Sequence, residues 1–213
     1  MRRLWELLQT AAFYRTVAFS LCRITLGFLA AAVLGSAAGA VSERSDLFDL
    51  LFSPVMAVIR STPVASFIIL ALVWLNRQII PGFICFLMAF PMFYSNIRAG
   101  IRSASDKLLE MAWLFRVSKA KIVRRIYIPA VKPYLLAAVR AALGMAWKAG
   151  VAAEVLCTPA NSIGKMLYQS KVYLETADVF AWTLTVILIS VLLEKLILRL
   201  LSDDGKGKEA QGE

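Results

Sequence analysis

The apolar residues of this chain gather into long blocks, separated by shorter stretches that are basic or contain proline. Five blocks are apolar enough to cross a bilayer, whose hydrocarbon core needs about 20 helical residues. We expect them at residues 17–41, 62–75, 79–95, 134–156 and 179–201. The second block is short, so it is expected to gain length from residues 47–61, with a break or kink caused by Pro54 and Pro63.

The composition agrees with a membrane protein. Of 213 residues, 60% are hydrophobic and the mean hydropathy is +0.70, whereas a soluble domain is about half apolar. We therefore expect an all-α, polytopic membrane protein whose residues 1–213 form a single transmembrane domain. Residues 1–16 are expected to form an amphipathic segment, because the apolar run behind them is too long for a signal peptide. Residues 202–213 have the composition of a disordered tail.

The net charge of +10 would suggest nucleic-acid binding in a soluble protein. In a membrane protein Lys and Arg collect in cytoplasmic loops, so nucleic acid is not expected as a partner. Residues 98–132 contain nine basic residues: Arg98, Arg102, Lys107, Arg116, Lys119, Lys121, Arg124, Arg125 and Lys132. This loop and the C-terminus are therefore expected to be cytoplasmic and, by counting spans, the N-terminus to lie outside. Arg2 and Arg3 weakly favour the opposite.

The basic loop has the pattern of two short helices. Ser105 and Asp106 are good N-cap residues, and strong helix formers follow them. A break is expected near residues 116–118 and a second helix over residues 119–128, which Pro129 and Pro133 should end before the fourth span. A solvated linker would not need this much order. We interpret the loop as a docking element for another protein, the alternative being that it packs on the chain's own helices.

Several classes of chemistry are disfavoured by the sequence. The chain has no histidine, and its three cysteines are far apart, so neither a metal site nor a disulfide framework is indicated. It also has no G-x-x-x-x-G-K phosphate loop, so if ATP is used, another chain must bind it. One possible function of a chain with several spans is that of a stand-alone secondary carrier or channel, although no inverted repeat supports it. An intramembrane enzyme would need catalytic groups within the spans, and no pair of acids lies at mid-membrane.

The first span carries small residues at every fourth position: Gly27, Ala31, Gly35 and Gly39. In lipid, such a stripe allows a second helix to approach backbone to backbone. The alternative is that glycine and alanine are simply common in membrane helices.

Ionisable residues inside spans are candidates for function, and the fourth span contains Arg140, Lys148 and Glu154. Lys148 is the deepest. It is expected either to line a path by which a solute crosses the membrane or to form a structural ion pair with another helix. Arg140 could extend to the inner surface and Glu154 to the outer one. We include Lys148 and Glu154 among the candidate path residues.

The break at residues 60–63 gives further candidates for the path, Ser61, Thr62 and Pro63. Irregular backbone at membrane depth is tolerated where it is buried in protein or lines a cavity, although a plain interfacial turn remains the alternative, particularly for Arg60. Asn96 is also included, at the end of a proline-containing stretch that is expected to kink the third span. Residues 158–178 are expected outside, as a re-entrant, gate-like element.

The loop resembles one known family, the permease subunits of binding-protein-dependent ABC importers. Their signature is E-A-A, three residues, G, nine residues, I-x-L-P; here Glu110-Met111-Ala112 is followed at the same spacing by Arg116 and by Ile126-Tyr127-Ile128-Pro129. Met111, Arg116 and Ile128 depart from it. Arg116 matters most, since a glycine in a turn can adopt a positive φ at little cost. The resemblance covers about residues 4–201, and the region around the signature is similar to the nitrate, sulfonate and taurine branch.

The resemblance implies a type I permease fold of about five spans, without enzymatic activity, in the bacterial cytoplasmic membrane. The basic loop would be a coupling helix that docks on a cytoplasmic ATPase subunit through Glu110, Ala112, Trp113, Leu114, Phe115, Arg116, Ser118, Ile126 and Pro129. The implied partners are two ATPase subunits that hold ATP and Mg, an external substrate-binding protein or lipoprotein, and a second permease chain, identical or a sister. This chain would bind no cofactor or metal. The solute would be small and anionic or zwitterionic, resembling nitrate, a sulfonate, taurine or a vitamin precursor.

Overall fold

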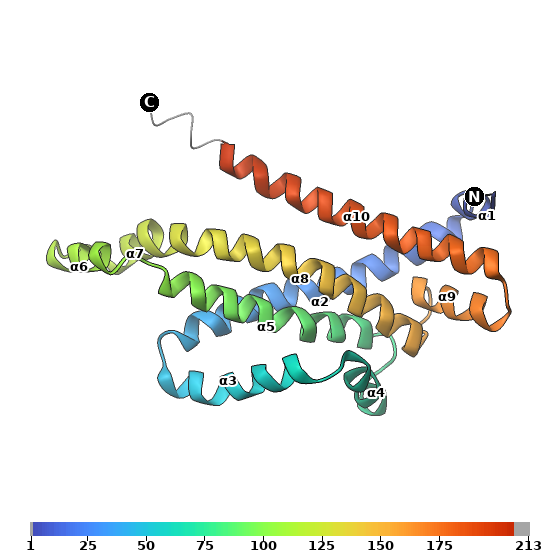
Figure 1. Cartoon of the computed structure of the whole chain (residues 1–213), viewed down its shortest axis with the longest axis horizontal. Helices are drawn as coiled ribbons and strands as arrows, with labels where there is room; N and C mark the ends of the chain where they lie inside the picture. The colour runs from blue at the N-terminus through green and yellow to red at the C-terminus, as the bar shows by residue number, and fades with distance from the viewer. Residues whose placement is uncertain (1, 207–213) are drawn as a thin grey trace.

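The computed structural model describes residues 2–206, and this part of the chain contains helices and turns but no strand (Figure 1). The helices are α1 (Arg2–Leu8), α2 (Ala11–Ser42), α3 (Asp46–Ser61), α4 (Val64–Trp74), α5 (Ile80–Arg102), α6 (Asp106–Leu114), α7 (Lys119–Ile122), the π-helix η1 (Val123–Tyr127), α8 (Ile128–Cys157), α9 (Ile163–Val172) and α10 (Thr176–Lys206). The all-α prediction is confirmed. Of the predicted tail, residues 202–206 continue α10, and residues 207–213 lie outside the described residues.

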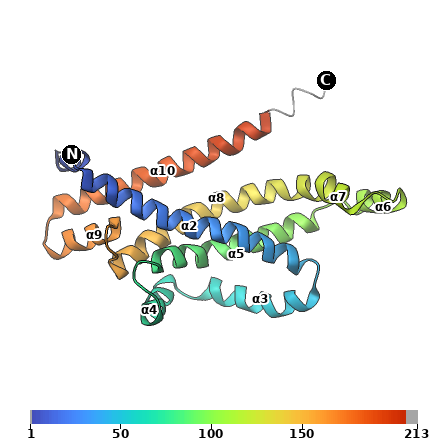
Figure 2. The ribbon, with the colours of Figure 1, turned by 180° about the vertical axis from the view of Figure 1, so that it is seen from behind.

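The long helices run along one axis of an elongated bundle. In Figure 1, α6 projects at one end of this axis, while α1 and α9 lie at the opposite end. The view from behind shows α2 lying along α5 (Figure 2). Helix α3 flanks the bundle on one side and α10 on the other (Figure 1). The two ends are called below the α6 end and the α9 end.

The spans agree with the five predicted blocks. Within the described residues, four helical segments are long and apolar enough to cross a membrane: Ala11–Ser42, Ile80–Arg102, Lys119–Cys157 and Thr176–Ile197. Helices α3 and α4 together form a fifth candidate, bent by 106°. The bend falls at Thr62 and Pro63, as predicted, because proline cannot supply the N–H that a continuous helix would need. Pro54 lies inside α3 without ending it.

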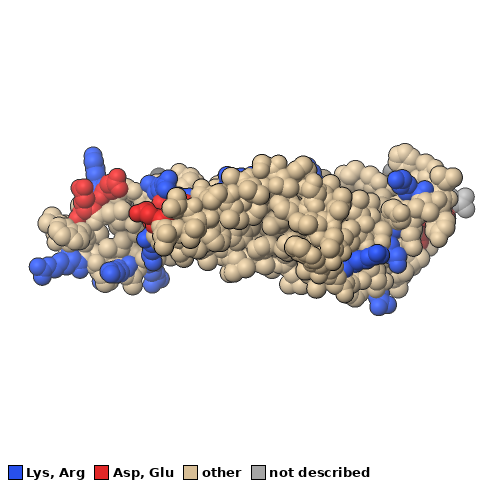
Figure 3. Space-filling view, turned by 90° about the horizontal axis from the view of Figure 1, so that it is seen from below, with Lys and Arg blue, Asp and Glu red and all other residues tan. Residues whose placement is uncertain are grey.

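The space-filling view supports a membrane belt. On the face shown in Figure 3, Lys and Arg gather toward the two ends of the molecule and the middle is largely uncharged. Helix α5 is the central helix. In its apolar 18-residue stretch 67% is buried inside the protein, whereas the corresponding stretches of α2 and α10 are 22% and 17% buried. The apolar faces that α2 and α10 leave exposed are therefore available to lipid.

The small-residue stripe of α2 is a packing face, and α5 is its partner. A Cβ atom added at Gly27 would lie 2.1 Å from the carbonyl oxygen of Gly82, and one added at Gly39 would lie 2.6 Å from that of Tyr94. Ala31, between them, is fully buried. The two backbones approach so closely that no larger side chain fits.

The structure corrects the prediction that Pro129 and Pro133 end the loop's second helix. Helices α7, η1 and α8 follow one another without a break, so the fourth span begins inside the basic loop. In η1 the N–H of Ile128 donates to the carbonyl of Val123, five residues back. This wider turn changes the position of the carbonyl groups near Pro129, which otherwise would collide with the proline ring.

An ion-pair cluster ties α2, α3 and α5 together near the α6 end. The guanidinium of Arg98 donates from Nε to Glu43 at 2.8 Å and from Nη2 to Asp49 at 2.7 Å, and Arg102 donates from Nε to Glu43 at 2.9 Å. Burial acts to raise the pKa of Glu43, but the hydrogen bonds from Arg102 and Arg98 outweigh it and hold this pKa below its ordinary value. Two of the nine basic residues counted in the loop are thus neutralised by acidic residues elsewhere in the chain.

Candidate coupling loop and translocation path

The projecting end of α6 carries an exposed apolar cluster. Trp113, Leu114 and Phe115 are 81%, 71% and 72% exposed, whereas Ala112, directly before them, is buried. Three adjacent large apolar side chains in water are unfavourable unless a partner covers them. Glu110, about one helical turn before Trp113, is also exposed.

Arg116 ends α6 in the left-handed conformation, with φ of 51°. The N–H of Val117 donates to the carbonyl of Ala112 at 2.8 Å, and the N–H of Arg116 donates to that of Trp113 at 3.0 Å. This is the Schellman arrangement, whose left-handed position usually holds glycine. The turn therefore keeps the shape that glycine would give, at a cost of about 1–2 kcal/mol for the side chain of Arg116.

This geometry predicts that Arg116→Gly stabilises the protein by about 1 kcal/mol. Lys107→Gly, inside α6, should instead destabilise it by about 1 kcal/mol, because glycine weakens a regular helix. Unfolding in SDS, followed by circular dichroism, would measure both changes. Equal destabilisation by the two substitutions would contradict the left-handed conformation of Arg116.

The other loop residues singled out from the sequence surround this turn. Ser118 is exposed and precedes α7, Ile126 is half-buried in η1, and Pro129 is exposed in the first turn of α8. The loop is one surface that runs from α6 into α8, with exposed basic residues at Lys119, Lys121, Arg124 and Arg125.

Four of the predicted path residues line one cavity of about 660 Å³ beside the α3–α4 bend: Ser61, Thr62, Pro63 and Asn96. The hydroxyls of Ser61 and Thr62 donate to the carbonyl of Val58, and Asn96 donates from Nδ2 to that of Met92, so each keeps an acceptor oxygen. Arg60 also lines the cavity and donates to the carbonyl of Pro91 at 3.0 Å.

Lys148 and Glu154 lie elsewhere. Lys148 is exposed and lines a second cavity between α8 and α10. Glu154 does not extend to the outer surface as the sequence suggested, because it is fully buried. Its carboxylate accepts hydrogen bonds from Ser20 Oγ at 2.8 Å, from Arg23 Nη1 at 2.9 Å and from the backbone N–H of Gly164 at 3.2 Å.

The Glu154 cluster was not foreseen from the sequence. It joins α2, α8 and the first turn of α9, since Ser20 Oγ also accepts from the N–H of Ile163 at 2.9 Å. Arg23 was the available signal, as an arginine inside an apolar block needs a counter-charge. Its partner is 131 positions away, a distance over which sequence spacing carries no information.

Removing Arg23 should be costly, because it leaves the buried carboxylate of Glu154 without its cation. We expect Arg23→Gln to destabilise the protein by about 3 kcal/mol. Arg15→Gln on the same helix is the control, expected to change stability by less than about 0.5 kcal/mol, because Arg15 is exposed. Equal effects of the two substitutions in SDS unfolding would show that the ion pair contributes little.

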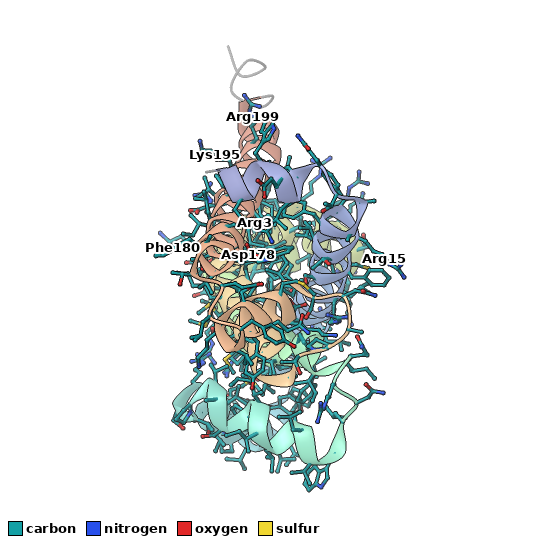
Figure 4. All side chains as sticks on the ribbon, turned by 90° about the vertical axis from the view of Figure 1, so that its right-hand side faces the viewer. Arg3, Arg15, Asp178, Phe180, Lys195 and Arg199 are labelled. Atoms are coloured by element: carbon teal, nitrogen blue, oxygen red, sulfur yellow. The ribbon has the colours of Figure 1, made fainter. Side chains whose placement is uncertain are left out.

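The basic N-terminus is also paired. Arg3 of α1 donates from Nη2 to the carboxylate of Asp178, in the first turn of α10, at 3.1 Å, and from Nη1 to Glu6 at 3.2 Å. In Figure 4 the two labelled residues, Arg3 and Asp178, lie next to each other at the α9 end. The hydrogen bonds that Arg3 donates to Asp178 and Glu6 raise the pKa of its guanidinium. The charge of Arg3, one of the two arginines that weakly disfavour an external N-terminus, is thus balanced by acidic partners.

Comparison with known proteins identifies the family. Residues 24–202 match the family described as "Binding-protein-dependent transport system inner membrane component". The chain belongs to this family. It is therefore a multi-pass, non-enzymatic transmembrane subunit of an ABC importer, in which a separate chain is the ATPase, and its partner classes are an ATPase and a substrate-binding protein. The resemblance stated from the loop signature is confirmed.

Curated relatives are similar over most of this chain. It is 25% identical over 191 residues to the bicarbonate transport system permease protein CmpB of Synechococcus elongatus, covering 89% of this chain and 68% of that protein. It is 27% identical to the putative aliphatic sulfonates transport permease protein SsuC of Bacillus subtilis, with coverages of 83% and 64%. It is 33% identical to the nitrate import permease protein NrtB of S. elongatus, with coverages of 66% and 50%.

Two solved structures share the fold. A chain of the MetNI methionine ABC transporter in inward-facing conformations superposes with a TM-score of 0.68 at 15% identity, covering 89% of this chain and 93% of that one. A chain of an amino acid ABC transporter, solved with histidines, superposes with a TM-score of 0.66 at 20% identity. The match covers 88% of this chain and 91% of that one. The predicted type I permease fold is confirmed.

Proposed function

We propose that this permease subunit imports a small anionic or zwitterionic solute and is driven through the α6 loop by an ATPase subunit docked there. The observation that carries the proposal is the exposed cluster Trp113–Phe115 at the projecting tip of α6, within a signature whose spacing matches the family's throughout. Aromatic side chains of this kind dominate the affinity of protein interfaces.

The docking surface combines apolar anchors with charge. Trp113, Leu114 and Phe115 insert into a groove of the ATPase, and Glu110 and the neighbouring basic residues set the orientation. Ala112 and Arg116 hold the end of α6 in shape, while Ser118, Ile126 and Pro129 form its junction with α8. ATP and Mg bind to the ATPase.

The solute passes through the cavity lined by Ser61, Thr62, Pro63 and Asn96. Its wall offers hydroxyl, amide and guanidinium groups, which suit a small polar solute. The bicarbonate, aliphatic sulfonate and nitrate permeases among the relatives support an anionic solute. Two copies of the chain assemble as a homodimer, so that each coupling loop serves one of two ATPase subunits.

The proposed orientation places the α6 end in the cytoplasm and the α9 end outside. The nine basic residues of the loop support this assignment, because cytoplasmic loops are enriched in Lys and Arg. Helix α9 then faces the substrate-binding protein and, seated on the Glu154 cluster, closes the outer side of the path.

Uptake into vesicles tests the proposal. Purified complex reconstituted with its ATPase and binding protein should accumulate labelled bicarbonate, nitrate or ethanesulfonate with ATP, and not with a non-hydrolysable ATP analogue. Uptake by this chain alone, without ATPase or ATP, would instead support a stand-alone carrier.

A further inference from the structure

A second cavity, of about 250 Å³, opens between α8 and α10. It is lined by Arg140, Leu143, Gly144, Trp147, Lys148, Ser190, Leu193, Glu194 and Ile197. Arg140, Gly144 and Lys148 follow one another at every fourth position, so they share one stripe of α8. Ser190 and Glu194 face this stripe from α10.

The two cations of this stripe have no partner within the described residues. Arg140 and Lys148 form no hydrogen bond or ion pair there, in contrast to Arg3, Arg23 and Arg98. Both lie in the span Lys119–Cys157. An unpaired cation inside a span is costly in lipid and is usually retained for a function.

Gly144 keeps the space between the two cations open. A Cβ atom added at this glycine would meet nothing within 4 Å, whereas one added at Gly27, Gly150 or Gly164 would lie less than 3 Å from other atoms. A glycine inside a helix is unfavourable unless the missing side chain serves a purpose. Since no described residue of the chain fills the space, it is available to a ligand.

The position of the acidic residue leaves the charge unbalanced near Lys148. Helices α8 and α10 run in opposite directions (Figure 1), so Ser190 is closer to the level of Lys148, and Glu194 is further toward the α6 end, where Arg140 lies. Glu194 can therefore offset Arg140, and Lys148 remains as an uncompensated cation beside a hydroxyl donor.

We propose that this cavity binds an oxyanion, with the ammonium of Lys148 and the hydroxyl of Ser190 as its donors and with Arg140 as a second cation nearer the α6 end. The class includes nitrate, bicarbonate and sulfonate groups. The inference rests on the proposed function and deepens it, because it adds a site on α8 for the solute's anionic group, separate from the cavity beside the α3–α4 bend. An anionic lipid headgroup shares this chemistry and has to be distinguished by the test. A helix of a second copy is disfavoured as the occupant, because its apolar surface would have to bury two cations.

A cysteine at the open position tests the proposal without knowledge of the solute. The complex carries Gly144→Cys and Cys22→Ser, since Cys22 is exposed and Cys85 and Cys157 are buried. It is placed in discs of phosphatidylcholine and labelled with sulfonatoethyl or trimethylammonioethyl methanethiosulfonate. The anionic reagent should react at least about 10-fold faster than the cationic one, because the cations raise its local concentration. Nitrate or ethanesulfonate should slow this labelling.

Substitutions test whether Lys148 causes the faster labelling by the anionic reagent. Adding Lys148→Gln should remove most of the preference and Lys148→Arg should keep it, while Lys195→Gln, which replaces an exposed residue of α10 outside the cavity, should leave it unchanged. Equal rates for both reagents, or no labelling by either because a second copy covers the thiol, would overturn the proposal. So would protection by phosphatidylglycerol in the discs but not by nitrate or ethanesulfonate. Labelling needs neither ATPase nor uptake, so its outcome is separate from that of the proposed function.

Discussion

Trp113→Ala should lower the affinity of the permease for its ATPase subunit by about 30-fold or more and abolish ATP-driven uptake, because buried tryptophan anchors contribute about 2 kcal/mol or more at interfaces. Trp113 has few contacts in this chain, as its 81% exposure shows. Its loss should therefore leave the fold intact. Titration of the purified permease with labelled ATPase, together with thermal unfolding of the permease alone, separates docking from stability.

Trp74→Ala is the matched control for this substitution. Trp74 is 79% exposed, almost the same as Trp113, but it lies at the end of α4, far from α6 (Figure 1). We expect no change in ATPase affinity for this variant. If both tryptophans weakened ATPase binding equally, or if neither did, α6 would not be the docking element.

Gly27→Leu should prevent folding, because the space for its side chain is occupied by backbone. Even the Cβ atom would lie 2.1 Å from the carbonyl oxygen of Gly82. Helices α2 and α5 cannot move apart without losing the contacts along the whole stripe. The variant should yield no monodisperse protein in size-exclusion chromatography in mild detergent.

The effect of smaller substitutions, at glycines of α2 and α8, should follow the space available to the added carbon. Gly27→Ala should be more destabilising than Gly35→Ala, where the added Cβ would lie 2.9 Å from the carbonyl oxygen of Phe90. Gly144→Ala should be neutral or stabilising, because open space surrounds it and alanine favours a helix by about 1 kcal/mol. The same loss of stability at all three glycines would show that helix propensity, rather than close approach of α2 to α5, governs these positions.

Features encoded by local sequence were predictable. The spans could be located from the hydrophobic blocks, because a bilayer requires a minimum helix length. The break between α3 and α4 could be located from Pro63, because proline lacks an N–H. The signature spacing from Glu110 to Pro129 gave the family. The stripe from Gly27 to Gly39 suggested a packing face, although its partner, α5, could not be read from the sequence.

Features that depend on contacts between distant segments were not predictable. Glu154 was assigned to the outer surface because its depth was visible in the sequence but its partners Ser20 and Arg23 were not. Pro129 was expected to end a helix because the rule for proline assumes regular α turns, whereas the π turns of η1 accommodate it. For Arg116 the departure from the family's glycine left the shape of the turn open, and the structure shows that arginine adopts the left-handed conformation there.

Co-purification from native membranes shows directly whether an ATPase subunit docks on the α6 loop. The tagged chain is isolated from its native membranes in gentle detergent beside a Glu110→Arg variant, and every accompanying protein is identified. We expect an ATPase subunit to accompany the unmodified chain and to be largely lost from the Glu110→Arg sample. A stable chain that carries no ATPase and transports solute on its own in vesicles would show instead that it is a stand-alone carrier.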